Sequence, residues 1–187
     1  MKINLYALRA IYLHEMDRFR RTLTQSVLSP VLTTSLYFIV FGSVIGGYVE
    51  KIDGISYGSY IVPGLLMLTL LTQSISNTSF GIFFPKFNGT IYEILAAPIS
   101  TLEVVLAFVG AGATKTLIVS IIIFITSLFF VDVQVKYPLL MIFLLILVAF
   151  TFALFGFLIG LISSDFEQMS IIPTLFVTPM VFLGGSL

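Results

Sequence analysis

The sequence has no cysteine, no tryptophan and only one histidine among its 187 residues, and only 10% of the residues are charged. The lack of cysteine excludes a disulfide framework, a thiolate metal site and a catalytic thiol. A single histidine, His14, cannot form a metal cluster by itself. Nine basic residues balance nine acidic ones, so no excess positive charge indicates a nucleic-acid partner.

Apolar residues make up most of the chain, at 58% of the total. A soluble domain is about 45–50% apolar and about 25% charged. One soluble core of this size could not bury so many apolar side chains, so the bilayer must serve as the main solvent. The sequence therefore predicts an all-α, polytopic membrane protein with a single transmembrane domain over residues 1–187.

Residues 1–25 are the most highly charged part of the chain and show a helical pattern. A stripe of apolar residues beside several arginines is typical of an amphipathic helix that lies on a membrane surface. We expect such an interfacial helix on the inner leaflet, although an ordinary solvated helix would have the same pattern. The stripe consists of Leu5, Leu8, Tyr12, Met16, Phe19 and Leu23.

Five apolar segments follow, and each approaches the roughly 20 residues that a helix needs to cross the hydrocarbon. The sequence stops at Leu187 in apolar chain, which predicts a C-terminal truncation; the alternative is a five-span protein whose terminus lies outside. The predicted spans cover residues 27–47, 59–84, 104–131, 138–162 and 169–187.

The distribution of lysine and arginine predicts a cytoplasmic N-terminus, because cytoplasmic segments carry an excess of cations. The outer loops then contain only Lys51 and Lys136. The inner segments contain Lys2, Arg9, Arg18, Arg20, Arg21 and Lys86.

A short helix is expected on the cytoplasmic side between the second and third spans, within residues 86–100. Asn88 or Thr90 can cap its N-terminus. Pro98 disfavours helix at Ala97, which places the end of the helix before that residue. The predicted apolar face consists of Ile91, Ile94 and Leu95.

Polar side chains share one face of the second span at intervals of four residues: Thr69, Gln73 and Asn77. A polar group in hydrocarbon is unfavourable unless it finds a partner or water. Two interpretations stay open for this face. It forms hydrogen bonds between helices within the membrane, or it lines a translocation path or a subunit contact.

The fourth span carries a stripe of small residues, which allow helix backbones to approach closely in lipid. This helix-packing surface serves either the chain's own fold or a dimer contact. Its members are Ala149, Ala153, Gly156 and Gly160.

Lys115 is the only basic residue deep in a span. An intramembrane cation indicates function by default, but Lys115 could also snorkel or lie at a helix break near Gly110 and Gly112. The surrounding GAGATKT does not match a phosphate-binding loop, because Val109 and Thr114 occupy the positions that require glycine. We expect no nucleotide, metal or catalytic site in this chain.

Four sequence runs, in this order, carry a resemblance to a known family. They are FGSVIGG at 41–47, YIVPG at 60–64, NGTIYEILAAPIS at 88–100 followed by Glu103, and PMVFLGG at 179–185. Together with the N-terminal helix, they resemble ABC-2-type permeases, the membrane subunits of ABC exporters.

The resemblance implies six spans per subunit, of which the sixth is missing here, and pairing with a second copy or a sister subunit. It also implies two cytoplasmic ATPase subunits, which bind the ATP and Mg²⁺; no cofactor is expected in this chain. The segment 86–100 would be the coupling helix that docks on the ATPase. Its contact residues would be Asn88, Gly89, Thr90, Ile91, Tyr92, Glu93, Ile94, Leu95 and Pro98.

The resulting hypothesis is a non-enzymatic permease subunit for efflux across the bacterial inner (plasma) membrane. Three alternatives belong to other classes: a structural or assembly subunit without a transport path, an ion-coupled carrier and an intramembrane enzyme. No nucleophile–base arrangement supports an enzyme, and no acid pair within the spans supports a proton-coupled carrier.

Overall fold

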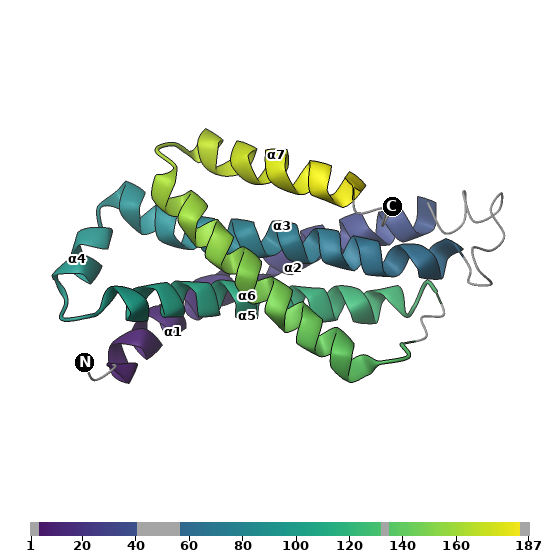
Figure 1. Cartoon of the computed structure of the whole chain (residues 1–187), viewed down its shortest axis with the longest axis horizontal. Helices are drawn as coiled ribbons and strands as arrows, with labels where there is room; N and C mark the ends of the chain where they lie inside the picture. Colours follow the sequence, from purple (N-terminus) through teal and green to yellow (C-terminus); the bar gives the residue numbers. More distant parts are fainter. Residues whose placement is uncertain (1–3, 41–56, 132–134, 184–187) are drawn as a thin grey trace.

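A computed structural model describes residues 4–40, 57–131 and 135–183 (Figure 1). These residues form helices and no strand, which confirms the predicted all-α class. The helices are α1 (Leu5–Arg21), α2 (Leu23–Tyr37), α3 (Tyr57–Asn88), α4 (Ile91–Ala96), α5 (Thr101–Ser127), α6 (Pro138–Ile162) and α7 (Phe166–Leu183).

Four helical segments in the described ranges are long and apolar enough to cross a membrane: Leu23–Val40, Gly58–Asn88, Thr101–Ser127 and Pro138–Ile162. They correspond to the first four predicted spans and confirm a polytopic membrane protein. The fifth predicted span, 169–187, corresponds to α7, in which the apolar stretch Phe166–Val177 is shorter. Residues 184–187 lie outside the described residues.

The helix bounds differ from the predicted spans mainly at α3. This helix has 32 residues, whereas the second span was predicted over 59–84. At 1.5 Å per residue its length is about 48 Å, which exceeds the roughly 30 Å of hydrocarbon in a bilayer. At least one end of α3 therefore projects beyond the hydrocarbon.

The other ends follow local signals. α5 begins earlier than predicted because Ser100 and Glu103 form a capping box, in which each side chain bonds the backbone N–H of the other residue. α6 has the predicted bounds, with Pro138 in its first turn. α2 begins at Leu23 instead of residue 27, and residues 41–47 of the predicted first span lie outside the described part of the chain.

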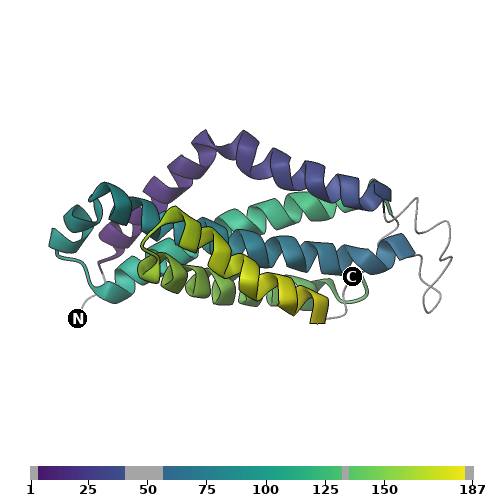
Figure 2. The same cartoon turned by 90° about the horizontal axis from the view of Figure 1, so that it is seen from above.

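The N-terminal segment is two helices that meet at Thr22, where the chain bends (Figure 2). α1 does not lie apart from the bundle, because it packs along most of α5, from Glu103 to Ile123. The Tyr12 hydroxyl donates a hydrogen bond to Thr114 Oγ1 at 3.1 Å, and Phe19 packs with Val119 and Ile123. The predicted lipid-facing stripe therefore faces protein over part of its length, whereas Leu5 at its start is 68% exposed.

α3 is the central helix, and α6 crosses it diagonally (Figure 1). The small residues of α6 lie at this crossing. A Cβ atom added to Gly156 would lie 2.4 Å from the carbonyl oxygen of Ile75, and one on Gly160 would lie 2.5 Å from that of Ser79. Ala149 and Ala153 are fully buried beside them. The structure thus places this stripe in packing within the chain rather than on a free surface.

The long helices α2, α3, α5, α6 and α7 alternate in direction, so the connections between them gather at two ends of the bundle (Figures 1 and 2). α4, the start of α1 and the turn between α6 and α7 lie at one end, whereas α3 and α6 begin at the other (Figures 1 and 2). This arrangement brings the predicted cytoplasmic segments to the same end.

Candidate functional site

The predicted coupling segment, residues 86–100, contains one short helix, α4. α4 covers only Ile91–Ala96, while Lys86 to Asn88 belong to α3 and Ala97 is extended before Pro98. Gly89 has a φ of 78°, which lets the chain turn between α3 and α4. Thr90 occupies the N-cap position without a capping hydrogen bond from its side chain.

The two faces of α4 differ from the predicted ones. Ile91 and Ile94 are half-buried and pack against a core cluster that includes Phe108 of α5. Leu95, which was predicted on the same face, is 68% exposed, like Tyr92 at 72%. Leu95 is therefore accessible to a partner, although it follows Ile91 by one helical turn. Glu93 is also exposed.

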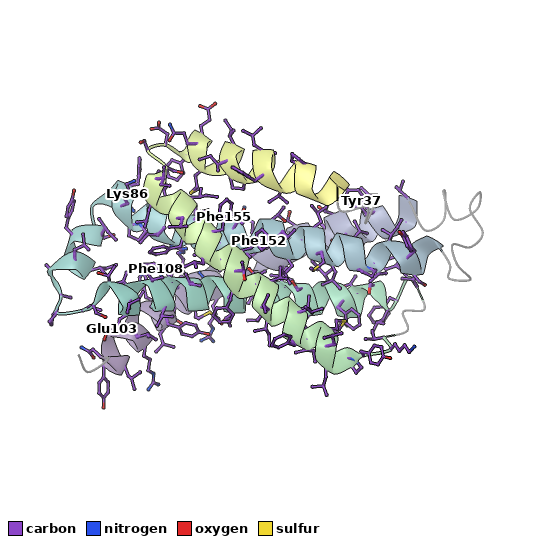
Figure 3. The ribbon with its side chains drawn as sticks, viewed as in Figure 1. Tyr37, Lys86, Glu103, Phe108, Phe152 and Phe155 are labelled. Atoms are coloured by element: carbon purple, nitrogen blue, oxygen red, sulfur yellow. The ribbon has the colours of Figure 1, made fainter. Side chains whose placement is uncertain are left out.

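The end of α3 is tied to the turn between α6 and α7. The Lys86 ammonium donates hydrogen bonds to the carbonyl oxygens of Leu161, at 2.7 Å, and Ser163, at 2.9 Å, where α6 ends (Figure 3). Carbonyl groups in the last turn of a helix have no partner within the helix, so a lysine there is favourable. The Phe166 ring adds contacts to Phe83 and Phe87, at centroid distances of 4.8 and 5.0 Å.

Lys115 forms a buried ion pair that neither of its two predicted roles included. Its ammonium lies 2.7 Å from Glu15 Oε2, and the two side chains are 4% and 2% exposed. Arg18 reaches the same oxygen at 2.8 Å. On α3, Gly81 leaves the room for this carboxylate, since a Cβ atom there would lie 3.3 Å from Glu15 Oε2. Lys115 therefore neither snorkels to the surface nor marks a helix break.

Sequence reasoning missed Glu15, although a signal for it was present. Glu15 follows Tyr12 by three residues and precedes Phe19 by four, so it lies beside the apolar stripe of α1. An acid in that position, in a chain with a lysine deep in a span, indicates an ion pair. The missing information was the packing of α1 against α5.

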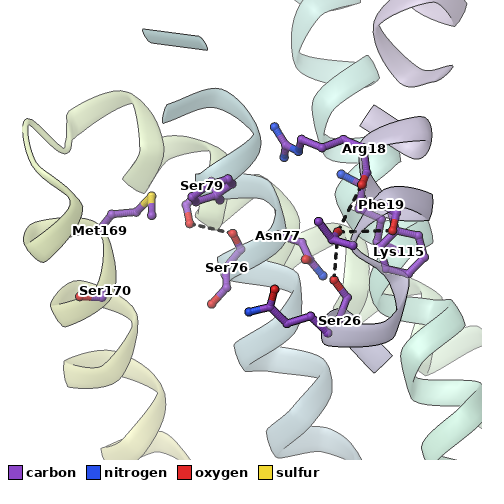
Figure 4. Close-up of a pocket in the computed structure, with 12 residues that line it drawn as sticks. Arg18, Phe19, Ser26, Ser76, Asn77, Ser79, Lys115, Met169 and Ser170 are labelled. Atoms are coloured by element: carbon purple, nitrogen blue, oxygen red, sulfur yellow. Dashed lines mark hydrogen bonds between the residues drawn. The ribbon is translucent and has the colours of Figure 1, made fainter. Parts of the chain in front are cut away.

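A polar cleft of about 410 Å³ opens beside this ion pair, between the α1–α2 junction and helices α3 and α7 (Figure 4). Arg18 and Lys115 lie in its wall, whereas none of the described residues contributes a carboxylate to it. Phe19, Phe80 and Met169 supply apolar surface. Hydroxyl and amide groups complete the lining, among them Gln25, Ser26, Ser76, Asn77, Ser79 and Ser170.

Only part of the polar face predicted on the second span lines this cleft. Asn77 lines the cleft, and its amide lies 3.4 Å from Thr116 Oγ1 and 3.5 Å from Gln73 Oε1. Gln73 and Thr69 are half-buried away from the cleft, and the Thr69 hydroxyl bonds the carbonyl of Leu65 in its own helix. One of the three candidate path residues thus reaches the cleft.

The residues resembling a phosphate loop lie inside α5, where Lys115 is already paired. A phosphate loop instead joins a strand to a helix. Within residues 4–40, 57–131 and 135–183, no group of three or more acidic or histidine side chains could hold a metal ion.

Comparison with known proteins identifies the family. A family profile described as "ABC-2 type transporter" matches residues 6–187. The chain is 38% identical over 179 residues to the inner membrane transport permease YadH of Escherichia coli K12, an alignment that covers 96% of this chain and 70% of that protein.

More distant relatives are the Nodulation protein J sequences of two bacteria. The one from Azorhizobium caulinodans is 22% identical over 94% of this chain and 70% of its own length. The one from Rhizobium meliloti is 23% identical over 95% of this chain and 68% of its own length. No solved structure matches the chain. The chain belongs to the ABC-2 type transporter family and is a membrane transport permease of that family.

Proposed function

We propose that this chain is the permease subunit of an ABC exporter in the bacterial inner membrane, with its N-terminus in the cytoplasm. Membership of the family and the name of YadH as an inner membrane transport permease support the proposal. Two copies, or this chain and a sister subunit, would pair around the substrate path. ATP and Mg²⁺ would bind to two separate ATPase subunits, which would carry out the hydrolysis.

The geometry of α4 carries the proposed coupling to the ATPase. Ile91 and Ile94 hold α4 against the bundle, while Tyr92, Glu93 and Leu95 face outward at the end of the molecule. A push on this outer face would move the end of α3 and, through Lys86, the turn between α6 and α7. Such a linked element is what a motor at the cytoplasmic surface requires.

The cleft is our candidate for the cytoplasmic part of the substrate path. It contains Asn77, and the Gln73–Asn77 hydrogen bond would extend the polar face toward Thr69 in the membrane interior. The cleft lies between α7 and the α1–α2 junction, and α7 follows directly from the turn that Lys86 contacts. Movement of α4 would therefore change the width of the cleft.

ATPase stimulation in reconstituted vesicles tests the proposal. The chain is combined with an ABC ATPase that copurifies with it, and the hydrolysis rate is measured with the wild type, Leu95→Ser and Glu93→Arg. Both variants change exposed residues of α4, so the helices stay folded while ATPase binding and stimulation fall by about tenfold.

Leu139→Ser is the matched control, because Leu139 is also an exposed leucine, at 83%, and lies at the opposite end of the bundle. The control should behave as the wild type. Unchanged copurification and stimulation with both α4 variants would contradict a coupling role for α4.

A further inference from the structure

We propose that the polar cleft binds the acidic headgroup, a phosphate or carboxylate group, of an amphiphile in the inner leaflet. The inference rests on the proposed function for the orientation of the chain in the membrane. It adds the chemical class of the molecule that the cleft accepts.

The charge of the cleft wall is the first argument. Arg18 and Lys115 contribute two cations, whereas the one carboxylate that they share, on Glu15, lies behind the wall and is 2% exposed. The net charge of Arg18, Lys115 and Glu15 together is therefore +1. Asp17 is the next acid on α1, but it is 63% exposed, pairs with Arg20 and does not line the cleft.

The donors that remain free form the second argument. The Glu15 carboxylate engages Nη2 of Arg18 and one hydrogen of the Lys115 ammonium. A guanidinium has five N–H donors and an ammonium has three, so each retains donors for a further acceptor. Charge-assisted hydrogen bonds from such groups are the usual means of recognising phosphate and carboxylate.

The depth of the cleft is the third argument and indicates a membrane ligand. Ser76 follows Tyr57, the first residue of α3, by 19 positions, which corresponds to about 28 Å along the helix. The hydrocarbon layer is about 30 Å thick, so Ser76 lies near the inner boundary if Tyr57 lies near the outer one. Lipid headgroups occupy that level.

A shallow groove on α2 continues from the cleft; Thr24, Ser29 and Thr33 line it together with two leucines, whose side chains would contact the tail of the ligand. It has a volume of about 510 Å³, runs along α2 and shares Gln25 with the cleft. Leu28 and Leu32 line it and are 51% and 60% exposed. A headgroup held by Arg18 would thus have its chain beside α2, in contact with the lipid.

Quenching by labelled lipids tests this site in the full chain, without ATPase or ATP. The sequence has no cysteine, so a single fluorophore can be attached at Thr174→Cys, an exposed position on α7 one turn beyond Ser170 and outside the cleft lining. The protein is placed in phosphatidylcholine vesicles that contain nitroxide-labelled phosphatidic acid or nitroxide-labelled phosphatidylcholine. We expect half-maximal quenching at an about tenfold lower mole fraction of the acidic lipid, the ratio that one charge-assisted hydrogen bond provides.

Arg18→Gln should remove this preference. The matched control is Arg20→Gln, which loses the same charge from the same helix at an exposed side chain outside the cleft and should keep the preference. Ser76→Leu narrows the cleft without touching the ion pair, so it tests the site even if Arg18→Gln fails to fold. Equal quenching by the two lipids, or equal losses in the Arg18 and Arg20 variants, would overturn the proposal.

Inorganic phosphate distinguishes the source of the anion. At 10-fold excess over the acidic lipid, it should leave the quenching unchanged if the ligand is an amphiphile. Complete displacement of the labelled lipid by phosphate would overturn the proposal of an amphiphilic ligand and identify a site for a soluble anion. Because no ATPase is present, failure of this test leaves the coupling experiment on α4 unaffected, and failure of coupling leaves the lipid preference measurable.

Discussion

At the scale of single residues, the ion pair between Glu15 and Lys115 is the feature with the largest energetic consequence. Both side chains are buried, and the second oxygen of Glu15, Oε1, has no hydrogen-bond partner among the described residues. Removing one member of a buried pair leaves an uncompensated charge and typically destabilises a protein by about 3–5 kcal/mol.

We therefore expect Lys115→Met to lower the stability of the purified protein by about 3 kcal/mol, because Glu15 keeps only the partly exposed Arg18 as its partner. The double variant Glu15→Gln with Lys115→Met should recover most of this loss, since no buried charge remains unpaired and Arg18, which is 25% exposed, can be hydrated. Thermal unfolding in detergent measures both effects.

Asp17→Asn is the control, because it removes an exposed carboxylate from the same helix and should change stability by less than about 0.5 kcal/mol. If the double variant were as unstable as Lys115→Met, the side-chain packing and not the charge pairing would be responsible.

The sequence revealed one partner of this pair and not the other. Lys115 stands out because a cation is rare within a span. Glu15 lies in a segment where charged residues are expected, so its burial depends on the docking of α1 onto α5. That contact joins residues 100 positions apart and leaves no local pattern.

At the scale of helices, the crossing of α6 over α3 depends on Gly156. A methyl group at this position would lie 2.4 Å from the backbone oxygen of Ile75, and a backbone cannot move aside as a flexible side chain can. We expect Gly156→Ala to destabilise the protein by about 1–3 kcal/mol, the range for overpacking. The melting temperature reports this loss.

Gly110→Ala is the matched control, since its new Cβ would meet only the ring of Tyr12, at 4.0 Å. This variant should melt close to the wild type. Equal melting temperatures for the two variants would show that the crossing tolerates a wider separation.

Lys86 makes a separate contribution, because it holds the end of α6 through two carbonyl groups. Lys86→Met should raise the amide hydrogen-exchange rates of residues 161–166 by about tenfold, as expected when contacts worth about 1.4 kcal/mol are lost. Mass spectrometry of the exchanged peptides measures this change.

The control is Lys136→Met, at the opposite end of the bundle, where the lysine lies over the ring of Tyr137. It should leave the exchange of residues 161–166 unchanged. Similar exchange in the Lys86 variant and the wild type would mean that Phe166 alone holds the turn.

The helices themselves were largely predictable, and their exact lengths less so. The bounds of α6 follow from Pro138 at its start and the end of the apolar run at Ile162. The end of α4 follows from Pro98, but its start does not, because α3 continues through Pro85 to Asn88 and leaves only Gly89 and Thr90 between the helices. Hydropathy alone does not show a helix that projects beyond the membrane.

At the scale of the whole molecule, the orientation in the membrane remains a prediction from the distribution of cations. Among the described residues, Arg9, Arg18, Arg20 and Arg21 belong to α1, which begins at the end that contains α4, and Lys86 belongs to the last turn of α3, whereas Lys136 precedes α6 at the other end. Cations are favoured on the cytoplasmic side, so α4 should face the cytoplasm.

Cysteine labelling in intact cells tests this orientation, because the chain has no cysteine of its own. A membrane-impermeant maleimide should label Lys136→Cys from outside and should label Asn88→Cys only after the cells are opened. Reversed labelling would place α4 outside, where no ATPase could reach it, and would exclude the proposed coupling.

The pairing of α1 with α5 also constrains how the protein is made. Glu15 leaves the ribosome 100 residues before Lys115, so α1 cannot reach its final place until three further spans, α2, α3 and α5, have entered the bilayer. Until then the nascent chain must keep this helix near the insertion machinery, with its acid in contact with water. A ribosome that stalled before residue 115 would release a chain whose first helix has no ammonium group to dock on, and such a chain would be a ready target for membrane proteases.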